Sequence, residues 1–439
     1  TSKRALNSRG KTSFSTDETH KPCLIDDHEG PMPERPDRLD STELRPRSLL
    51  VVADFDSRII WAQGVAEYFA AAGFCVTARL PAQAKRLPFK RNEDWIYEFH
   101  DDSSHAELIK DALRFDVVLV ALGGGANLKT INAIREACAK ERPRARPVII
   151  TGFNGLVDET DIHGLLCRVG SDIICINSPR NLRGFQSTLE QLSLPTSALY
   201  LTGFIRPDLG RSSGVERRRT IERVVYADQS GTMSSKKQAQ YVAEHLIAYA
   251  RRFPARQLII KIRPSWSVTQ GHVESFPIRQ ALRQVSGPLP SNLSFDAGDP
   301  AAALEKADLL LSFSSTMLIE AMIAGIRCAA ISDLGITKRL GNHVFVGSDL
   351  LCPFSAILND DIPVPNPLWL KDNVEFSPRR ITEMVAHAKA LLDQQASTGD
   401  ALPLQPPGYS IEKSPYMYRF TQAPKAKPKP WRLLRPLSQ

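Results

Sequence analysis

Side chains that can bind phosphate come together in the segment DLLLSFSSTMLIEAMIAG. An apolar stretch there predicts a buried strand, and Ser314 and Ser315 stand where the strand gives way to a helix that begins near Thr316 and carries Glu320. Hydroxyl groups and the free N–H groups of a helix's first turn bind anions. The segment predicts a phosphate site, although serines that only cap a helix would look the same.

Two further segments place polar groups directly after predicted strands. Lys261 and Arg263 follow the apolar residues of QLIIKIRP, and two cations at one strand end suit a diphosphate. Asp228, Gln229 and Ser230 follow the strand in ERVVYADQS, where they could contact a phosphate or a neutral polar group. Surface charge and ordinary turn chemistry remain the alternative explanations for these two sets.

Candidate groups for chemistry also occur in the first half. Asp54 and Asp56 follow the apolar run 49–53, and a carboxylate there could take a proton from a substrate hydroxyl or stabilise positive charge. Either one could instead cap the following helix beside Ser57. Weaker candidates for contacts to a second substrate are Ser57, Asn154, Arg180 and His343. The glycine-rich loop LGGGANLKT lacks dinucleotide or P-loop spacing, so it either admits a substrate to the backbone or simply turns tightly.

The elements that position these residues alternate between strand and helix. After residues 49–53 comes a helical pattern that stops at Gly73, and the alternation continues through RPVIITGF, DIICINS and ALYLTGF. A second series of the same kind starts near residue 222. Such alternation predicts parallel sheets covered on both faces, with ligands beyond the carboxyl ends of the strands. We therefore expect an α/β protein with two Rossmann-like, doubly wound domains that face each other across a cleft.

Composition sets the boundaries of these domains. We expect a disordered segment over 1–47, an N-terminal Rossmann-like domain over 48–208, a C-terminal Rossmann-like domain over 209–375, a closing helix over 376–399 and a basic, Pro-rich tail over 400–439. The 439 residues are 42% apolar and 24% charged, which is typical of a folded globular protein. There is neither a run of about 20 apolar residues nor the apolar core of a signal peptide, so a cytoplasmic protein is expected.

Cysteines and charge narrow the functional classes. The seven cysteines are scattered, with no CxxC pair, so we expect buried free thiols and no metal site. The net charge of +8 is concentrated in the tail KAKPKPWRLLRPLSQ, which either contacts the inner face of a membrane as a peripheral anchor or is simply solvated. No basic stripe with aromatic residues is present, which argues against a nucleic-acid partner.

Several of these segments together resemble a bacterial family of uncharacterised glycosyltransferases. They are ADFDSRIIWA, ADQSGTMSS, SFSSTMLIEAMIAGI, ISDLGI, LGNHVFVGSDLL and NPLWLKDN, in that order over about residues 48–372. More distantly, the basic-Pro and Ser-Ser motifs resemble capsule polysaccharide transferases, which include polysialyltransferases and Kdo transferases with CMP-activated donors. In those enzymes a His-Pro dipeptide and a Ser-Ser pair hold the nucleotide, whereas here Arg263 stands before Pro264.

The resemblance implies a metal-independent GT-B glycosyltransferase of polysaccharide biosynthesis that needs no cofactor. Its donor would be a nucleotide sugar, CMP-linked, and it would pass Kdo or another nonulosonic acid to a hydroxyl of a glycan or glycolipid. Asp54 or Asp56 would be the base, and Ser314 and Ser315 would hold the nucleotide. Two alternatives stay open: a CDP-polyol phosphotransferase of the teichoic acid type, and a non-catalytic protein that binds nucleotides or sugars.

Overall fold

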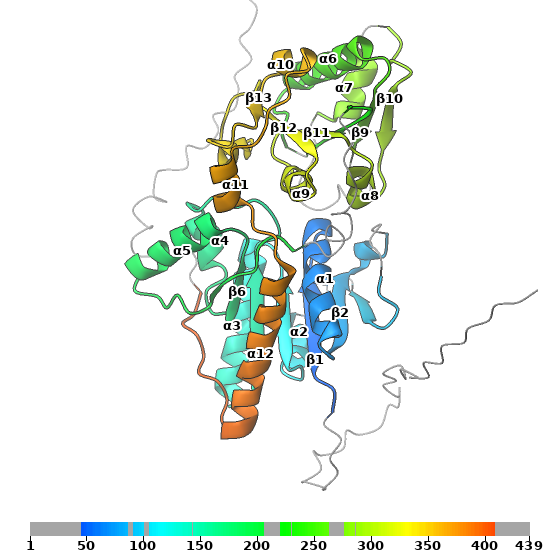
Figure 1. The fold of residues 1–439 in the computed structure, drawn as a ribbon. Helices are drawn as coiled ribbons and strands as arrows, with labels where there is room; N and C mark the ends of the chain where they lie inside the picture. The colour runs from blue at the N-terminus through cyan, green and yellow to red at the C-terminus, as the bar shows by residue number, and fades with distance from the viewer. Residues whose placement is uncertain are drawn as a thin grey trace, which may run out of the picture.

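The protein folds into two α/β lobes (Figure 1). Its structure, a computed structural model, describes residues 45–86, 91–100, 105–142, 144–205, 220–229, 231–262, 276–285 and 287–408, and only the backbone of Asp56. The expected disordered segment 1–47 therefore lies almost wholly outside the described residues, as does the tail beyond 408.

The N-terminal lobe is built on a parallel sheet of seven strands in the order β3-β2-β1-β4-β5-β6-β7. Its strands are β1 (Ser48–Ala53), β2 (Cys75–Pro81), β3 (Ile96–His100), β4 (Val117–Ala121), β5 (Val148–Gly152), β6 (Ile173–Ile176) and β7 (Leu199–Leu201). All residues of β4 and β5 are buried, as expected for strands with helices on both faces. The edge strand β3 is half-exposed and mixes charged with aromatic residues, so its sequence lacks the apolar run that marks the central strands.

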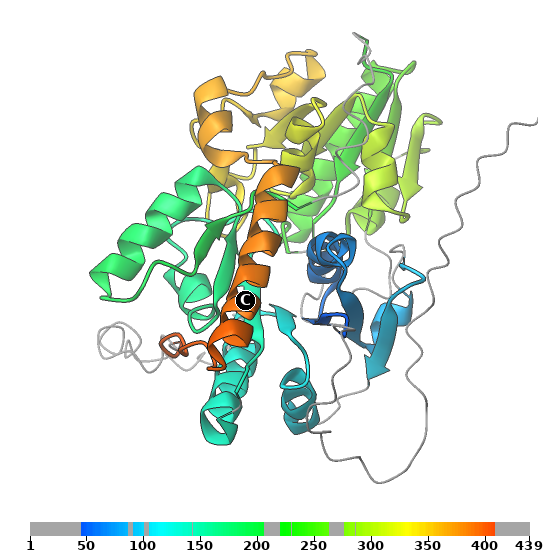
Figure 2. The same ribbon diagram turned by 60° about the horizontal axis from the view of Figure 1, so that its bottom comes forward.

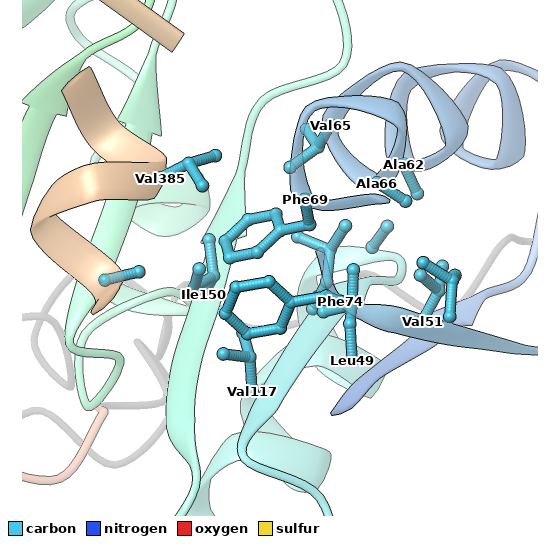
Figure 3. Close-up of a cluster of buried hydrophobic side chains, with 14 of the residues drawn as sticks. Leu49, Val51, Ala62, Val65, Ala66, Phe69, Phe74, Val117, Ile150 and Val385 are labelled. Atoms are coloured by element: carbon cyan, nitrogen blue, oxygen red, sulfur yellow. The ribbon is translucent and has the colours of Figure 1, made fainter. Parts of the chain in front are cut away.

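Alternate residues of the strands feed two separate cores. Leu49, Val51 and Val117 pack on one face with Phe69 of α1, and Figure 3 shows this cluster around Phe69 and Phe74. Leu50, Val52 and Val118 pack on the other face, against α2 and α3. The helical elements of this lobe are α1 (Asp56–Ala71), η1 (Ala82–Arg86), α2 (His105–Ala112), α3 (Gly124–Glu141), α4 (Ile162–Leu166) and α5 (Pro179–Gln191).

The C-terminal lobe repeats the design with six parallel strands in the order β10-β9-β8-β11-β12-β13. Its strands are β8 (Arg223–Ala227), β9 (Gln257–Lys261), β10 (Leu293–Asp296), β11 (Leu309–Ser312), β12 (Arg327–Ile331) and β13 (Leu351–Cys352). Its helical elements are α6 (Lys236–Arg252), α7 (Ile278–Gln284), α8 (Pro300–Glu305), α9 (Met317–Ile323), η4 (Asn342–Phe345), α10 (Phe354–Leu358) and α11 (Pro367–Asn373). One face packs on α6 and α7, and the other on α9 and α11.

Both sheets reverse their strand order at one point, between β1 and β4 in one lobe and between β8 and β11 in the other. The carboxyl ends of strands at such a switch point leave a crevice, because the following helices go to opposite faces of the sheet. The prediction of two Rossmann-like, doubly wound domains in the GT-B arrangement is confirmed.

The last helix, α12 (Pro378–Thr398), returns from the C-terminal lobe to the N-terminal one (Figures 1 and 2). Met384, Val385 and Ala388 are buried in the same core as Leu49 and Phe69. The returning chain passes beside the outgoing one, where the Phe204 N–H donates to the Glu375 carbonyl at 2.8 Å. The N-terminal core is therefore completed by residues that follow the whole C-terminal lobe in sequence.

The first residues of the expected tail are also attached to the N-terminal lobe. Arg146 forms a buried ion pair with Asp172 at 2.7 Å and also donates to the carbonyls of Leu402 and Pro403. The chain over 401–408 has no regular secondary structure. Leu402 is nevertheless buried, so this part of the tail packs on the protein.

The expectation of free thiols is confirmed for the six cysteines in the described part of the chain. Five of these are buried and Cys75 is half-buried. Burial raises the pKa of the Cys175 thiol to about 12 and that of Cys328 to about 12, so both remain protonated at neutral pH. No helix among the described residues is long and apolar enough to cross a membrane.

Candidate functional site

A cleft of about 940 Å³ lies where the carboxyl ends of the two sheets face each other. Its walls come from both lobes, which is the place that the strand order of two doubly wound sheets assigns to a ligand. Of the residues proposed from the sequence, those that line it are Ser57, Asn154, Asp228, Gln229, Lys261, Ser314, Ser315, Thr316, Glu320 and His343. Ser230 and Arg263 fall outside the described residues.

Gln229 fixes the C-terminal wall at the switch point between β8 and β11. Its Oε1 accepts a hydrogen bond from the Ser314 backbone N–H at 2.8 Å and lies 3.3 Å from the hydroxyl of Ser312. The Ser314 hydroxyl in turn donates to the Leu340 carbonyl. Ser314 thus links three segments of the wall, so its hydroxyl has a structural task whether or not a ligand is bound.

Ser315 and Thr316 take positions slightly different from those expected. Thr316 is the N-cap of α9, without a side-chain capping bond, and the Ser315 hydroxyl accepts from the Met317 N–H at 3.3 Å. Glu320, at 6% exposure, lies one turn further along and lines the cleft with them. A buried carboxylate beside hydroxyl groups is suited to accept hydrogen bonds from a polar ligand.

Lys261 provides a buried positive charge on this wall. It is only 6% exposed, and its Nζ donates to the Gly298 carbonyl at 2.7 Å and lies 3.9 Å from an oxygen of Asp296. Burial lowers the pKa of Lys261, while Asp296 and Asp299 act in the opposite direction. An ammonium group at the edge of a cleft, whose ion pair with Asp296 is as long as 3.9 Å, can also bind an anionic ligand.

The two aspartates after β1 do not have equivalent positions. Asp54 accepts from the Arg58 guanidinium at 2.6 Å with one oxygen and from the Gly123 N–H at 3.0 Å with the other. It is not among the residues that line the cleft, and it joins the end of β1 to the loop after β4. The backbone of Asp56 begins α1, and the next residue, Ser57, lines the cleft.

Of the weaker candidates, Ser57 and Asn154 meet at the cleft. The Asn154 amide donates to the Ser57 hydroxyl at 3.0 Å, which joins the start of α1 to the loop after β5. Arg180 pairs instead with Glu159 at 2.5 Å and does not line the cleft.

His343 belongs to a polar cluster that crosses the cleft. Its Nε2 lies 3.0 Å from Asp158, a residue of the other lobe, and Lys338 pairs with the same carboxylate at 3.1 Å. Burial alone would raise the pKa of Asp158, but hydrogen bonds from Thr160, His343 and Lys338 hold it well below its usual range. Asp158 is therefore a permanently charged contact between the lobes and a poor proton acceptor.

A known protein family matches the part of the chain that forms both walls of this cleft. Residues 49–391 match the model of the family described as "Putative glycosyltransferase (DUF6716)", and this range contains both lobes and most of α12. The chain belongs to this family. The comparison with curated proteins gave no match.

Solved structures are similar to this member of the DUF6716 family. A "putative UDP-N-acetylglucosamine 2-epimerase" from Listeria monocytogenes is 12% identical, with a TM-score of 0.51 over 80% of this chain and 97% of its own. UGT89C1 from Arabidopsis thaliana, solved with UDP-L-rhamnose, is 12% identical, with a TM-score of 0.46 over 81% of this chain and 97% of its own. At 12% identity, the likeness to the Listeria monocytogenes structure describes the fold and nothing about the substrate.

Several residues that line the cleft of this DUF6716 protein were not predicted from its sequence. Asp158 and Lys338 were overlooked because their partners are 185 and 180 positions away, on the opposite lobe. Arg168 and His163 line the N-terminal wall. A signal for Arg168 was available, since it is a lone cation within the apolar run 165–169.

Proposed function

We propose that the protein transfers a sugar from a nucleotide-linked donor to a hydroxyl group of an acceptor. The observation that carries this proposal is the cleft between two doubly wound lobes in a chain of a glycosyltransferase family. Its C-terminal wall combines a buried lysine, hydroxyl groups and a buried carboxylate. These are the groups that a nucleotide diphosphate and its ribose need.

The proposed donor site consists of Asp228, Gln229, Lys261, Ser314, Ser315, Thr316 and Glu320. Lys261 would face the phosphates, because it is a buried cation of this wall, whereas Lys338, the other lysine there, is paired with Asp158. Ser315 would donate a hydrogen bond to a phosphate oxygen, since its hydroxyl acts as the acceptor in its bond with the Met317 N–H and can still donate. Glu320 would accept from ribose or sugar hydroxyls.

Asp56 is the proposed base. Both oxygens of Asp54 are already engaged by Arg58 and Gly123, which leaves Asp54 less suited to remove a proton from an acceptor hydroxyl. Ser57 and Asn154 would orient the acceptor beside the start of α1, with His343 at the far side of the cleft. No cofactor is part of this proposal.

The identity of the donor is the open part of the proposal. The CMP-linked donor and the transfer of Kdo or another nonulosonic acid rest on the capsule-transferase resemblance, and its His-Pro dipeptide is here Arg263 and Pro264. What the site supports is a nucleotide sugar in general. We also propose that the acceptor is a glycan or glycolipid, as the same resemblance implies. Contact with the inner face of a membrane, through the basic tail, is likewise a proposal.

The test is a screen of UDP-, GDP-, dTDP-, CMP- and CDP-linked donors, first for binding by thermal shift and then for turnover with glycan and glycolipid acceptors. We expect donors of one nucleotide class to raise the melting temperature of the protein. The free nucleotide of that class should be produced only when an acceptor is present. Ser315→Ala should weaken donor binding and leave the melting temperature unchanged. It is a better probe than Ser314→Ala, which would also remove the bond to Leu340.

Other products would contradict the proposal. Inversion of the donor sugar without transfer would indicate an epimerase. Transfer of a polyol phosphate with release of CMP would indicate the teichoic acid type of reaction. Stable donor binding without any product, across the acceptor panel, would indicate a non-catalytic binding protein.

A further inference from the structure

The segment 154–160, which follows β5 in the N-terminal lobe, lies against two parts of the opposite wall. The first is the start of α9. A Cβ atom at Gly155 would lie 2.7 Å from Thr316 Cγ2, and Leu156 packs on the C-terminal core that contains Met317. The N-terminal lobe therefore touches the helix start that carries hydroxyl groups of the proposed donor site.

The second contact joins this segment to the loop 337–343 of the C-terminal lobe. Asp158 uses Oδ1 within its own segment, where it accepts from the Thr160 N–H at 2.9 Å. Its Oδ2 faces the other lobe, 3.0 Å from His343 Nε2 and 3.1 Å from Lys338 Nζ. Lys338 also donates to the Thr160 hydroxyl at 2.8 Å. The contact is charge-assisted and involves both ends of the loop.

The loop 337–343 is closed by hydrogen bonds between its own residues. The Gly341 N–H lies 3.1 Å from the carbonyls of both Thr337 and Lys338. The side chain of Asn342, which is fully buried, accepts from the Thr337 N–H at 3.0 Å. Because these bonds fix the residues relative to one another, a shift at either end of the loop is passed to its middle.

The middle of the same loop supports the C-terminal wall of the cleft. The Leu340 carbonyl accepts from the Ser314 hydroxyl, and a Cβ atom at Gly341 would lie only 2.8 Å from that hydroxyl oxygen. Gly341 also has a φ of +74°, which suits glycine. Arg339 donates to the Thr232 carbonyl, 3.0 Å away in the segment after β8. The loop thus connects the contact between the lobes to the residues proposed to bind the donor.

We infer that Asp158 is a positioning residue for the donor site, although it belongs to the opposite lobe. It holds the loop 337–343 in the place where that loop supports Ser314. That the supported wall binds the donor rests on the proposed function, whereas the contact between Asp158 and the loop does not. Coupling of this kind is reciprocal, so a nucleotide bound on the C-terminal wall should in turn strengthen the contact between the lobes.

Asp158→Asn gives the inference a prediction of definite sign. The nucleotide part of a donor is anionic, so removal of a carboxylate from the cleft would tighten nucleotide binding if charge alone mattered. If Asp158 positions the wall, binding weakens instead, and we expect the nucleotide Kd to rise at least about fivefold. Glu159→Gln is the matched control, because this neighbouring carboxylate pairs with Arg180 of its own lobe. Its Kd should stay near the wild-type value.

The probe is whichever of UDP, GDP, dTDP, CMP and CDP raises the melting temperature of the full chain most, and its Kd is measured by calorimetry. A rise in Kd for Asp158→Asn, with no rise for Glu159→Gln, supports the inference. An unchanged or lowered Kd in Asp158→Asn would overturn it.

Hydrogen exchange tests the contact without any ligand. Asp158→Asn should speed exchange of the Gly341 and Ser314 amides, whereas Glu159→Gln should not. The amide of Ile150, in the buried strand β5, should keep its protection and show that the variant is folded. Unchanged exchange at Gly341 would contradict the positioning role. If the loop loosens but none of the five nucleotides binds, the proposed function fails and the link between Asp158 and the loop stands.

Steady-state kinetics then show which substrate depends on Asp158. The residue lines the cleft, so it could contact the acceptor directly. Asp158→Asn should raise the KM for the donor and leave the KM for the acceptor near the wild-type value. A raised KM for the acceptor alone would make Asp158 an acceptor contact and overturn the inference.

Discussion

Asp54 shows that a carboxylate at the end of a strand can be fully occupied by structural contacts. Its oxygens bind Arg58 and the Gly123 N–H, so it connects β1 to the first turn of α3 at the switch point. A carboxylate that connects two segments and a carboxylate that acts as a base need different surroundings. The base needs a free lone pair near the acceptor hydroxyl, whereas the connector needs both oxygens engaged.

The two aspartates can be separated by paired amide substitutions. Asp54→Asn should lower the free energy of unfolding by about 1–2 kcal/mol, because it breaks a charge-assisted bond and weakens a second one. Asp56→Asn should leave unfolding unchanged and reduce kcat by about 100-fold or more. Chemical denaturation and initial rates measure the two effects. A stable Asp54→Asn protein that has lost turnover would move the catalytic role to Asp54.

Lys261 destabilises the folded state in its charged form, and the same charge is proposed to bind the donor phosphates. Because burial lowers its pKa, the folded state holds the proton less tightly than the unfolded state, and the charged lysine destabilises the fold at neutral pH. Stability of the wild type should therefore rise as pH increases toward about 10, where the unfolded lysine also loses its proton.

Lys261→Met tests both properties. The free energy of unfolding at neutral pH should stay within about 1 kcal/mol of the wild type or rise, and the difference should narrow as pH approaches about 10. Donor affinity should fall about 10- to 100-fold, since a charge-assisted contact contributes about 1.5–3 kcal/mol. Denaturation over pH and donor titration are the measurements. Unchanged donor affinity would remove Lys261 from the phosphate site.

At the scale of elements, α12 decides whether the N-terminal lobe has a complete core. Its buried residues Met384, Val385 and Ala388 cover the face of the sheet that α1 leaves open. The hydrophobic face of the helix is visible in the sequence, but the surface that it covers begins more than 300 residues earlier. The helix contributes to stability through these long-range contacts.

Met384→Ala should therefore destabilise the protein by about 2–5 kcal/mol, because Met384 is fully buried and its truncation leaves a cavity in the N-terminal core. Gln394→Ala on the exposed side of α12 is the control and should change the free energy of unfolding by less than about 0.5 kcal/mol. Denaturant unfolding provides the comparison. Similar small effects in both variants would show that α12 is not integral to this core.

For the whole molecule, the contact between the lobes sets the width of the cleft. The two walls approach closely at Gly155, where a Cβ atom would lie 2.7 Å from Thr316 Cγ2. Asp158 adds the charged contacts to His343 and Lys338 nearby. A side chain at position 155 would therefore require Thr316 to shift or the two walls to move apart.

Gly155→Ala should thus reduce kcat/KM by about tenfold, because it displaces the acceptor wall from the donor wall by a fraction of an ångström. Thr316→Ser removes the clashing methyl group and keeps the hydroxyl, so the double variant should recover most of the activity. The double-mutant cycle isolates the coupling between the two positions. Additive losses would show that the Gly155–Thr316 approach does not control the cleft.

The sequence alone determined the order of strands and helices in each lobe. Strands such as 49–53 and 148–152 are apolar on both faces, and that pattern depends only on local burial. The order then placed Lys261, Gln229 and Ser315 at carboxyl ends of strands, on one wall. The edge strands β3, β10 and β13 were not predicted, because half-exposed or very short strands have no such apolar pattern.

Only the tertiary structure decided which of these residues work together. It engaged Asp54 with Arg58 and Gly123 and set Asp158 against His343 on the other lobe. It also buried Arg168 against the carbonyls of Gly152 and Gly164. These relations depend on the distance between segments far apart along the chain. The local sequence does not determine that distance. The same residue types could form hydrogen bonds or ion pairs with many different partners until the two sheets are packed.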